Sequence, residues 1–278
     1  MDLVTHTDLD GVASAYFIKK HVKINEIYFA QPNQINDGTV NVPKEFIIAD
    51  LPYHEKCSMW FDHHASSKIN EKFEGKFDAN APSASQVICD YYKDYEDEEI
   101  LREVNKADTA SFSLKELRNP KYWVLLYYVL DSNQPESFLK LIIEEMKKGM
   151  KGLKENPIIF QRMNDKLEEL KIGDAYLKKK SVIEGRVLYC DLRDSGLSYS
   201  PNRIFAVYPE IEYAFLLKKK EDKTAISIRA NSLKRTNTID LGKIMKSFGG
   251  GGHISAAAVL VEDSKVDSVV KKILSALN

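Results

Sequence analysis

The chain has 278 residues, of which 44% are hydrophobic and 29% charged, as in ordinary soluble globular proteins. Its 40 basic and 41 acidic side chains leave a net charge of −1. Proteins that hold long nucleic acids usually carry a strong basic excess, because neutralising phosphates supplies most of their affinity. We therefore expect no stable complex with a long nucleic acid and favour a small anionic ligand.

The sequence shows no feature of a membrane or secreted protein. No apolar run reaches the roughly 20 residues that a membrane-spanning helix needs, and the first residues lack the basic flank and apolar core of a signal peptide. Cys57, Cys89 and Cys190 are far apart and form no C-x-x-C pair, which indicates neither a disulfide framework nor a structural zinc site. We expect a cytoplasmic protein; its oligomeric state stays open, a homodimer included.

The first 110 residues alternate short apolar segments with helical ones, which is typical of a parallel sheet flanked by helices. A tight turn at Asp10-Gly11 is expected to precede a helix over residues 12–20. Ser83 is a suitable N-cap for a second helix that ends near residue 92. The expected strands are residues 3–5, 27–30, 46–49 and 59–61.

Residues 96–180 are predicted to be mostly helical, and the charged stretch 147–180 indicates a solvated connector. Beyond it, strands are expected at 187–189, 213–217 and 224–229, and apolar spacing predicts helices over 241–248 and 266–277. The predicted fold class is α/β, with three parts. They are an N-terminal parallel-sheet domain with flanking helices (1–150), a helical linker (151–185) and a smaller C-terminal α/β domain (186–278).

Three of the predicted N-terminal strands end in residues that bind metals. The first runs into His6-Thr7-Asp8-Leu9-Asp10-Gly11, the third into Asp50 and the fourth into Asp62-His63-His64. Because the carboxyl ends of parallel strands lie along one edge of a sheet, where ligands bind, we expect these side chains to converge. Each piece alone could be a turn or a surface histidine, but together they predict one site.

The residue types indicate the metal and the reaction. Aspartate and histidine without nearby cysteine favour Mn²⁺ or Mg²⁺, with Mn²⁺ better suited to imidazole; Co²⁺ and Zn²⁺ stay open. This many carboxylates can hold two ions about 3.5–4 Å apart, with one carboxylate shared between them. A water between such ions loses a proton near neutral pH and attacks phosphorus in line. The pattern therefore predicts a two-metal phosphoesterase that needs no serine or cysteine nucleophile.

These motifs match a known family. The H-x-D-x-D-G start, Asp50 and the Asp62-His63-His64 triplet resemble the DHH phosphoesterase superfamily, which is named for that triplet. Segments 227–231 and 248–253 resemble its DHHA1 substrate domain. Two departures, the short interval from Asp50 to Asp62 and Ala258 where the family usually has glycine, leave the subfamily open.

The resemblance implies a role for each matching residue. Asp50 would bridge two metal ions and would be catalytic, together with His64 beside the scissile phosphate. Asp62 would orient a histidine. The implied metal ligands are His6 and Asp8 for one ion, Asp10 and His63 for the other, the bridging Asp50, and Asp108 at a helix end.

The implied substrate contacts lie in the C-terminal domain. Arg229 would bind a terminal phosphate through two hydrogen bonds, and the glycines would let backbone N–H groups approach a phosphate. The residues implied in substrate binding are Arg229, Gly250, Gly251, Gly252 and His253.

The expected function is Mn²⁺-dependent hydrolysis of short oligonucleotides or dinucleotides, such as pApA, to mononucleotides, as in nano-RNases. Removal of phosphate from 3′-phosphoadenosine-5′-phosphate would accompany it. The enzyme alternatives are an inorganic polyphosphate or pyrophosphate hydrolase and a RecJ-like exonuclease on long DNA, which the near-neutral charge disfavours. A catalytically silent nucleotide-binding regulator is the alternative outside catalysis. An RNA-binding module is disfavoured, since aromatic and basic residues do not interleave.

Overall fold

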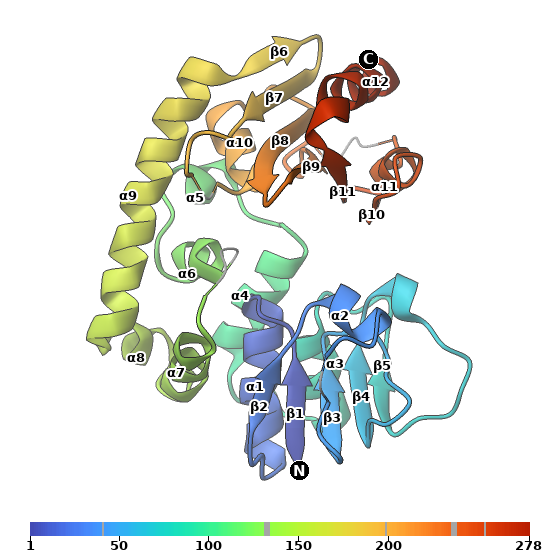
Figure 1. Ribbon diagram of the computed structural model, residues 1–278. Coiled ribbons are helices and arrows are strands. Elements are labelled where there is room, and N and C mark those ends of the chain that lie inside the picture. Colours follow the sequence, from blue (N-terminus) through green and yellow to red (C-terminus); the bar gives the residue numbers. More distant parts are fainter. Residues whose placement is uncertain (41, 131–133, 198, 235–237, 253) are drawn as a thin grey trace. The chain divides into compact units, whose positions relative to one another are not determined.

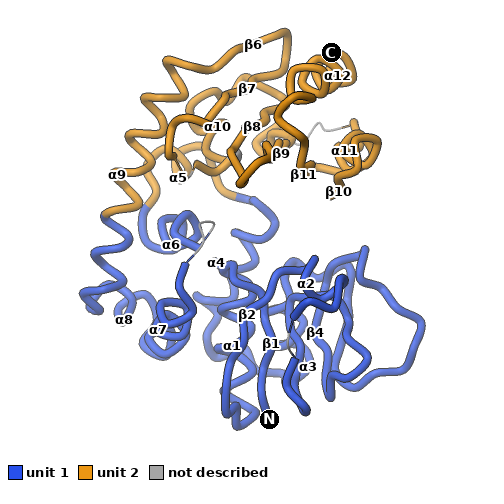
Figure 2. Tube along the Cα trace, in the orientation of Figure 1, with its two compact units in different colours: residues 1–111, 121–164 blue, residues 112–120, 165–278 orange. Residues whose placement is uncertain are grey.

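The computed structural model describes residues 1–278 except 41, 131–133, 198, 235–237 and 253. The chain forms two compact units (Figure 2). Unit 1 comprises residues 1–111 and 121–164, and unit 2 comprises residues 112–120 and 165–278. Both contain helices and strands, which confirms the predicted α/β class. Among the described residues, no helix is both long and apolar enough to cross a membrane.

Unit 1 is built on a five-stranded sheet whose strand order is β2-β1-β3-β4-β5, with every pair parallel (Figure 1). The four predicted N-terminal strands are confirmed. The fifth was not expected, because its sequence Gly-Lys-Phe has no apolar run and its residues are half-buried. The strands are β1 (Asp2–Thr5), β2 (Ile27–Phe29), β3 (Phe46–Ala49), β4 (Met59–Asp62) and β5 (Gly75–Phe77).

Helices cover one face of this sheet. Helix α1 (Leu9–His21) contacts α3 (Ala84–Tyr92), α4 (Glu98–Asp108) and α7 (Glu136–Met146). The opposite face buries Trp60 and other apolar side chains beneath α2 (Pro32–Asn36) and the loops. Burial on both faces explains why β3 is a continuous apolar run. The remaining helices of unit 1 are η1 (Ala65–Ser67), α6 (Tyr122–Leu130) and α8 (Gly149–Glu155).

The start of α1 corrects one prediction. Asp10 and Gly11 lie in the first turn of the helix, not in a turn before it. Asp8 is the N-cap, and its Oδ1 accepts a hydrogen bond from the Gly11 backbone N–H at 3.0 Å. A Cβ at Gly11 would lie 2.3 Å from the His6 carbonyl oxygen, so glycine is needed for close packing. The predicted N-cap of α3 is confirmed, since the Ser83 hydroxyl accepts from Gln86 N.

Unit 2 contains a six-stranded sheet of order β10-β11-β9-β8-β7-β6. β7 and β8 pair in parallel, and the other described pairs are antiparallel. The strands predicted near residues 187, 213 and 224 are confirmed. Strands β6, β10 and β11 were not expected, because they are short or rich in glycine and alanine. The six are β6 (Val182–Glu184), β7 (Val187–Asp191), β8 (Tyr213–Lys220), β9 (Lys223–Ala230), β10 (Gly251–Gly252) and β11 (Ala256–Glu262).

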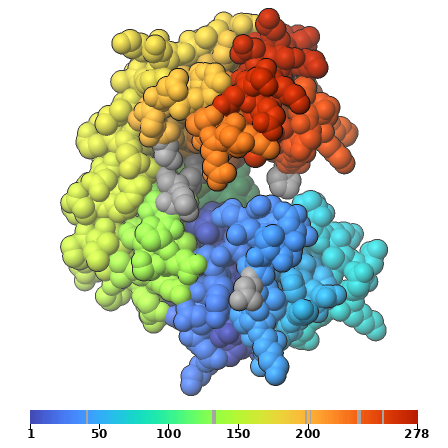
Figure 3. All heavy atoms as spheres, viewed as in Figure 1, coloured from blue at the N-terminus to red at the C-terminus, as the bar shows by residue number. Residues whose placement is uncertain are grey.

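Two cores enclose this second sheet. One lies beneath α11 (Leu241–Lys246) and α12 (Val266–Leu277), and the other beneath α10 (Pro201–Val207) and the C-terminal part of α9. A short 3-10 helix, η2 (Asp263–Lys265), directly precedes α12. Helix α11 ends two residues before Phe248, which packs against the first of these cores. Side chains fill the space between the ribbons of each unit (Figure 3).

The boundaries between the two units follow residues 111, 120 and 164, whereas the predicted domain boundaries are at 150 and 185. Helix α5 (Leu114–Arg118) belongs to unit 2, and the 24-residue helix α9 (Pro157–Lys180) begins in unit 1 and ends in unit 2. The view of residues 147–180 as a solvated connector is incomplete, because α9 has a buried apolar side. That side consists of Ile159, Met163, Leu170 and Leu177.

Candidate metal centre

The segment after β1 presents three of the predicted ligands. His6 directly follows the strand, Asp8 caps α1, and Asp10 is buried in its first turn. The Thr5 hydroxyl donates to the carbonyl oxygen of Gly11 at 2.8 Å and so ties the strand end to the helix. One short stretch of chain therefore fixes His6, Asp8 and Asp10 at the edge of the sheet.

Asp50 directly follows β3 and adopts the left-handed backbone conformation, with φ of 56°. Aspartate is among the few side chains that tolerate this region. The Asp50 N–H donates to the carbonyl oxygen of Phe61 at 2.9 Å, which holds the residue against β4. Its carboxylate is 1% exposed, and within the described structure neither oxygen has a hydrogen-bond partner. A buried carboxylate in this state is costly unless a cation pairs with it.

The histidine triplet follows β4. Asp62 is fully buried, and its Oδ1 accepts hydrogen bonds from the backbone N–H groups of His63 (2.8 Å) and His64 (3.2 Å) and from Nδ1 of His64 (2.8 Å). The contact with the His64 ring is the one that an orienting role for Asp62 requires. Nδ1 of His63 lies 3.1 Å from the Ala81 carbonyl oxygen. Since a carbonyl only accepts, Nδ1 carries the proton and Nε2 of His63 presents its lone pair.

These strand ends meet in space. Nδ1 of His6 lies 2.9 Å from Oδ2 of Asp8 and 3.6 Å from Oδ2 of Asp50. Nε2 of His63 lies 3.3 Å from Oδ2 of Asp108, 3.8 Å from Oδ2 of Asp10 and 4.0 Å from Oδ1 of Asp50. Ligand atoms lie within 4.8 Å of one another in three groups, which are His6-Asp8-Asp50, Asp10-His63-Asp108 and Asp50-His63-His64. The structure thus brings all six predicted ligands together in unit 1.

Charge in this cluster is unbalanced. Burial, reinforced by the neighbouring carboxylates, raises the pKa of Asp10, Asp50 and Asp108. At Asp8 burial acts in the same direction, but the His6 ring outweighs it and lowers the pKa. Divalent cations would offset this repulsion. Within the described residues, the oxygens of Asp50 and Nε2 of His63 form no hydrogen bond, and a donor set of carboxylates and imidazoles fits such ions.

His64 borders the cluster. Its side chain is 33% exposed, and its Nδ1 lies 3.8 Å from Oδ1 of Asp50. Burial alone would lower the pKa of His64, but the hydrogen bond and charge of Asp62 outweigh burial and raise it to about 8. The raised pKa favours the protonated ring, which lies at the border of the cluster.

Two polar residues that contact the cluster were missed in the sequence, because neither lies in a recognisable motif. Oε1 of Gln31 lies 3.2 Å from Nε2 of His6, and Nε2 of Gln31 donates to the Thr7 hydroxyl at 2.8 Å. The Ser85 hydroxyl lies 2.6 Å from Oδ1 of Asp10. The contacts of Gln31 and Ser85 form only because α2 and α3 pack beside the strand ends.

The predicted substrate-binding residues lie in unit 2. Arg229 is half-buried on β9, opposite Ala256 of β11, and alternates with the buried residues of that strand. A Cβ at Gly250 would lie 2.2 Å from the Ala258 carbonyl oxygen, and one at Gly252 would lie 2.4 Å from that of Ala256. These two glycines are therefore required by packing against β11, whereas the Gly251 position faces open space. His253 lies outside the described residues.

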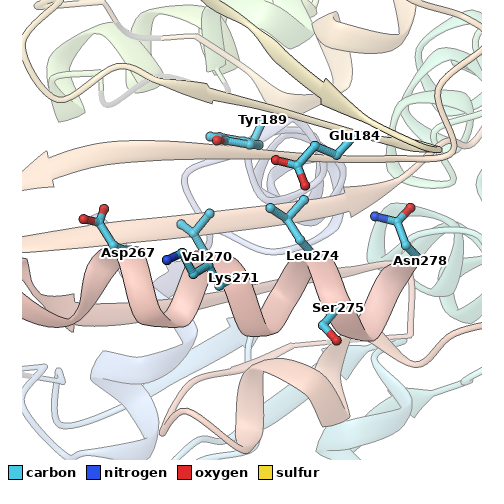
Figure 4. A pocket seen from close by; sticks show the side chains of 8 residues that line it. All are labelled: Glu184, Tyr189, Asp267, Val270, Lys271, Leu274, Ser275 and Asn278. Carbon is cyan, nitrogen blue, oxygen red and sulfur yellow. The ribbon is translucent and has the colours of Figure 1, made fainter.

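Unit 2 also contains a hollow of about 560 Å³ between β6, β7 and α12 (Figure 4). None of the predicted site residues lines it. Its lining is Glu184, Tyr189, Asp267, Val270, Lys271, Leu274, Ser275 and Asn278.

Comparison with known proteins agrees with the motifs. The family model of the DHHA1 domain matches residues 209–278, which span β8 to α12. The whole chain is similar to the structure of PggH, a pGpG-specific phosphodiesterase from Vibrio cholerae. The TM-score is 0.80 at 22% identity, and the match covers 99% of this chain and 97% of that one. Residues 209–278 therefore form a DHHA1 domain, and the whole chain shares the fold of PggH.

Two other similarities are more distant and show a shared fold. Exonuclease RecJ bound to manganese matches with a TM-score of 0.58 at 9% identity, over 100% of this chain and 90% of that one. An exopolyphosphatase-related protein from Bacteroides fragilis matches with a TM-score of 0.55 at 12% identity, over 99% and 90% of the two chains. A search of curated protein sequences found no match.

Proposed function

We propose that this DHH/DHHA1 protein is a divalent-metal-dependent phosphodiesterase that hydrolyses dinucleotides and other very short oligonucleotides to mononucleotides. The observation that carries the proposal is the buried, unpartnered carboxylate of Asp50 where the groups of ligand atoms meet. The similarity to a pGpG-specific phosphodiesterase over nearly the whole chain supports a dinucleotide substrate.

The ligand groups indicate how two ions would be held. His6 and Asp8 would bind one ion, Asp10, His63 and Asp108 the other, and Asp50 would be shared. Bound ions would supply an activated water and offset charge on the phosphate oxygens. Mn²⁺ is the proposed metal, because it suits mixed carboxylate and imidazole ligands and because one similar structure, RecJ, binds manganese.

The chain's own residues have separate tasks in this proposal. Asp62 holds the Nδ1 proton of His64, so Nε2 is the atom that would deliver a proton to the leaving oxygen. Arg229 would bind the terminal phosphate of the substrate, and Gly251 and His253 would contact it nearby. Free Cys57, Cys89 and Cys190 suit the reducing cytoplasm that we propose as its location.

One experiment separates the candidate substrates. The full chain is incubated with Mn²⁺ and, separately, with pGpG, pApA, 3′-phosphoadenosine-5′-phosphate and inorganic polyphosphate, and products are separated by chromatography. We expect mononucleotides from both dinucleotides, with slower hydrolysis of the bisphosphate. Orthophosphate from polyphosphate alone would favour the polyphosphatase, to which the Bacteroides fragilis similarity points. Nucleotide binding without any product would favour a silent regulator.

Asp50→Asn tests the metal centre. Because it removes the charge of the shared carboxylate, we expect turnover of pGpG to fall at least about 100-fold while the circular dichroism spectrum is kept. Glu55→Gln is the matched control, since it removes an exposed charge from the same loop and should leave turnover within about twofold. Turnover near the wild-type level in Asp50→Asn would contradict the assignment.

Arg229→Ala tests the substrate-binding role. Loss of a charge-assisted contact with a terminal phosphate should raise KM for pGpG about tenfold, with a smaller change in kcat. Lys223→Ala is the control, because Lys223 lies at the other end of β9 and pairs with Glu262. An unchanged KM in Arg229→Ala would remove Arg229 from the site.

A further inference from the structure

Helix α3 anchors the Asp10 carboxylate. The backbone N–H of Ala84 donates to Oδ2 of Asp10 at 2.7 Å, and that of Ser85 donates to Oδ1 at 2.9 Å. These are the first two N–H groups of α3, which have no partner within the helix. The partial positive charge of a helix N-terminus also favours a carboxylate. Asp10 is therefore held by a helix that follows it by more than 70 residues.

The Ser85 side chain makes this anchoring asymmetric. Its hydroxyl lies 2.6 Å from Oδ1 of Asp10, and both side chains are buried. Oδ1 thus accepts two hydrogen bonds from Ser85, whereas Oδ2 accepts one from Ala84. Oδ2 is also the oxygen that lies 3.8 Å from Nε2 of His63. The helix therefore holds both oxygens, Oδ1 through two hydrogen bonds and Oδ2 through one, and Oδ2 also faces the ligand group formed with His63 and Asp108.

Ser14 provides a natural comparison. It is fully buried on α1, and its hydroxyl lies 3.3 Å from that of Ser85. Within the described residues, its hydroxyl contacts that of Ser85 and not the Asp10 carboxylate. The two serines therefore share burial and size, and they differ in their contact with the predicted ligand.

We propose that Ser85 is a positioning residue of the metal centre. Its hydroxyl engages Oδ1 of Asp10 and directs Oδ2 toward the cation held with His63 and Asp108. This inference rests on the proposed function, because it gives Asp10 a metal to bind. It adds a residue outside the ligand motifs, on a different helix, whose hydroxyl sets how Asp10 binds.

The test measures metal binding without substrate. Mn²⁺ is titrated by calorimetry into metal-free full-length protein, and the melting temperature is measured without metal. Ser85→Ala should weaken one Mn²⁺ affinity about tenfold, as is typical for loss of a group that orients a ligand. Ser14→Ala should change Mn²⁺ affinity less than about twofold, although it also removes a buried hydroxyl. Ser85→Thr keeps the hydroxyl and should retain most of the affinity.

Activity provides a second readout. Saturating Mn²⁺ should restore pGpG turnover of Ser85→Ala to within a few-fold of wild type, because the defect lies in cation binding. If Ser85→Ala bound Mn²⁺ as tightly as wild type, or if Ser14→Ala lost equal affinity, the positioning role would be overturned. If Ser85→Thr folds poorly, Ser85→Cys replaces it, and we expect an intermediate affinity. A wild-type protein that bound no Mn²⁺ would overturn the proposed metal centre together with the role of Ser85.

Discussion

At the scale of single residues, the centre contains two buried carboxylates in opposite situations. Oδ1 of Asp62 accepts three hydrogen bonds from the residues that follow it. Asp50 is equally buried, but neither of its oxygens accepts a hydrogen bond within the described residues. Hydrogen-bonded buried charges are tolerated, whereas unpaired ones cost free energy. Asp62 therefore stabilises the folded chain through its own hydrogen bonds, and Asp50 destabilises it until a cation binds.

This contrast predicts opposite effects on stability. In metal-free protein, Asp50→Asn should raise the free energy of unfolding by about 1–2 kcal/mol, because it removes a buried carboxylate that accepts no hydrogen bond. Asparagine also tolerates the positive φ of this position. Asp62→Asn should instead lower the free energy of unfolding, since it removes the charge of a carboxylate that accepts three hydrogen bonds. Denaturant unfolding with EDTA measures both, and a destabilised Asp50→Asn would contradict the argument.

Saturating Mn²⁺ should make the wild type more stable than Asp50→Asn. Ligand that binds only the folded state stabilises it, so wild type should gain more melting temperature from Mn²⁺ than Asp50→Asn does. An equal gain in the two proteins would show that Asp50 does not contribute to cation binding.

At the scale of elements, a polar cluster joins α1 to the connection between α3 and α4. Nζ of Lys20 lies 2.8 Å from Asp94 and 2.7 Å from Asp97, which also accepts from the Tyr16 hydroxyl at 2.8 Å. Nε2 of His21 lies 2.9 Å from Asp94. Since α1, α3 and α4 carry Asp10, Ser85 and Asp108, this cluster helps to hold together the helices behind the metal centre.

The cluster predicts a pH dependence. Burial would raise the pKa of Asp94, but the hydrogen bond from Lys20 and its neighbours outweigh burial and lower it. A depressed folded-state pKa contributes stability above the unfolded value of about 3.9, and that contribution is lost as pH falls through the folded pKa. Asp94→Asn should therefore cost about 1–2 kcal/mol at pH 7, and the difference from wild type should shrink below about pH 4.

Urea unfolding from pH 7 to pH 3 measures this difference. Asp37→Asn removes an exposed carboxylate elsewhere in unit 1 and is the control. A stability difference between Asp94→Asn and wild type that stayed constant down to pH 3 would show that Asp94 is not the titrating group.

At the scale of the molecule, two units have separate cores, and the chain passes between them after residues 111, 120 and 164. The short excursion 112–120 is held in unit 2 by Arg203. Its guanidinium is buried, lies 2.6 Å from Asp174 and donates to the carbonyl oxygen of Leu117. A second bond runs from Nε of Arg118 to the carbonyl oxygen of Ala206 at 2.9 Å. These contacts assign α5 to unit 2 even though unit 1 flanks it in the sequence.

Breaking the ion pair between Arg203 and Asp174 should destabilise unit 2 more than unit 1. Asp174→Ala leaves a buried guanidinium without its carboxylate, a change that typically costs about 3–5 kcal/mol. Hydrogen exchange should show lost protection in β7 and β8 of unit 2, with β1 and β3 of unit 1 unchanged. Asp194→Ala, at an exposed position of unit 2, is the control. Equal loss in both units would show that they unfold together.

The contrast between prediction and structure follows from the range of the interactions. Strand β3 and the end of β4 were predictable, because a strand buried on both faces is a continuous apolar run and its last residue reaches the ligand edge. Asp108 came from the family resemblance, since a helix-terminal acid carries no local signal. Strand β11 was missed because its alanine-rich start is not typical of a strand. The contacts of α5 with α10 carry no local signal in the sequence.

The sequence by itself determined the chemical types at the strand ends and the edge of the sheet on which they lie, since parallel pairing aligns those ends whatever surrounds them. Only the tertiary structure decided which group supports each ligand. Ser85 on α3, Gln31 beside α2 and the carbonyl of Ala81 reach Asp10, His6 and His63 across long sequence separations. Hydrogen bonds of this kind depend on how helices and loops pack on the sheet, and packing leaves no periodic pattern at these positions.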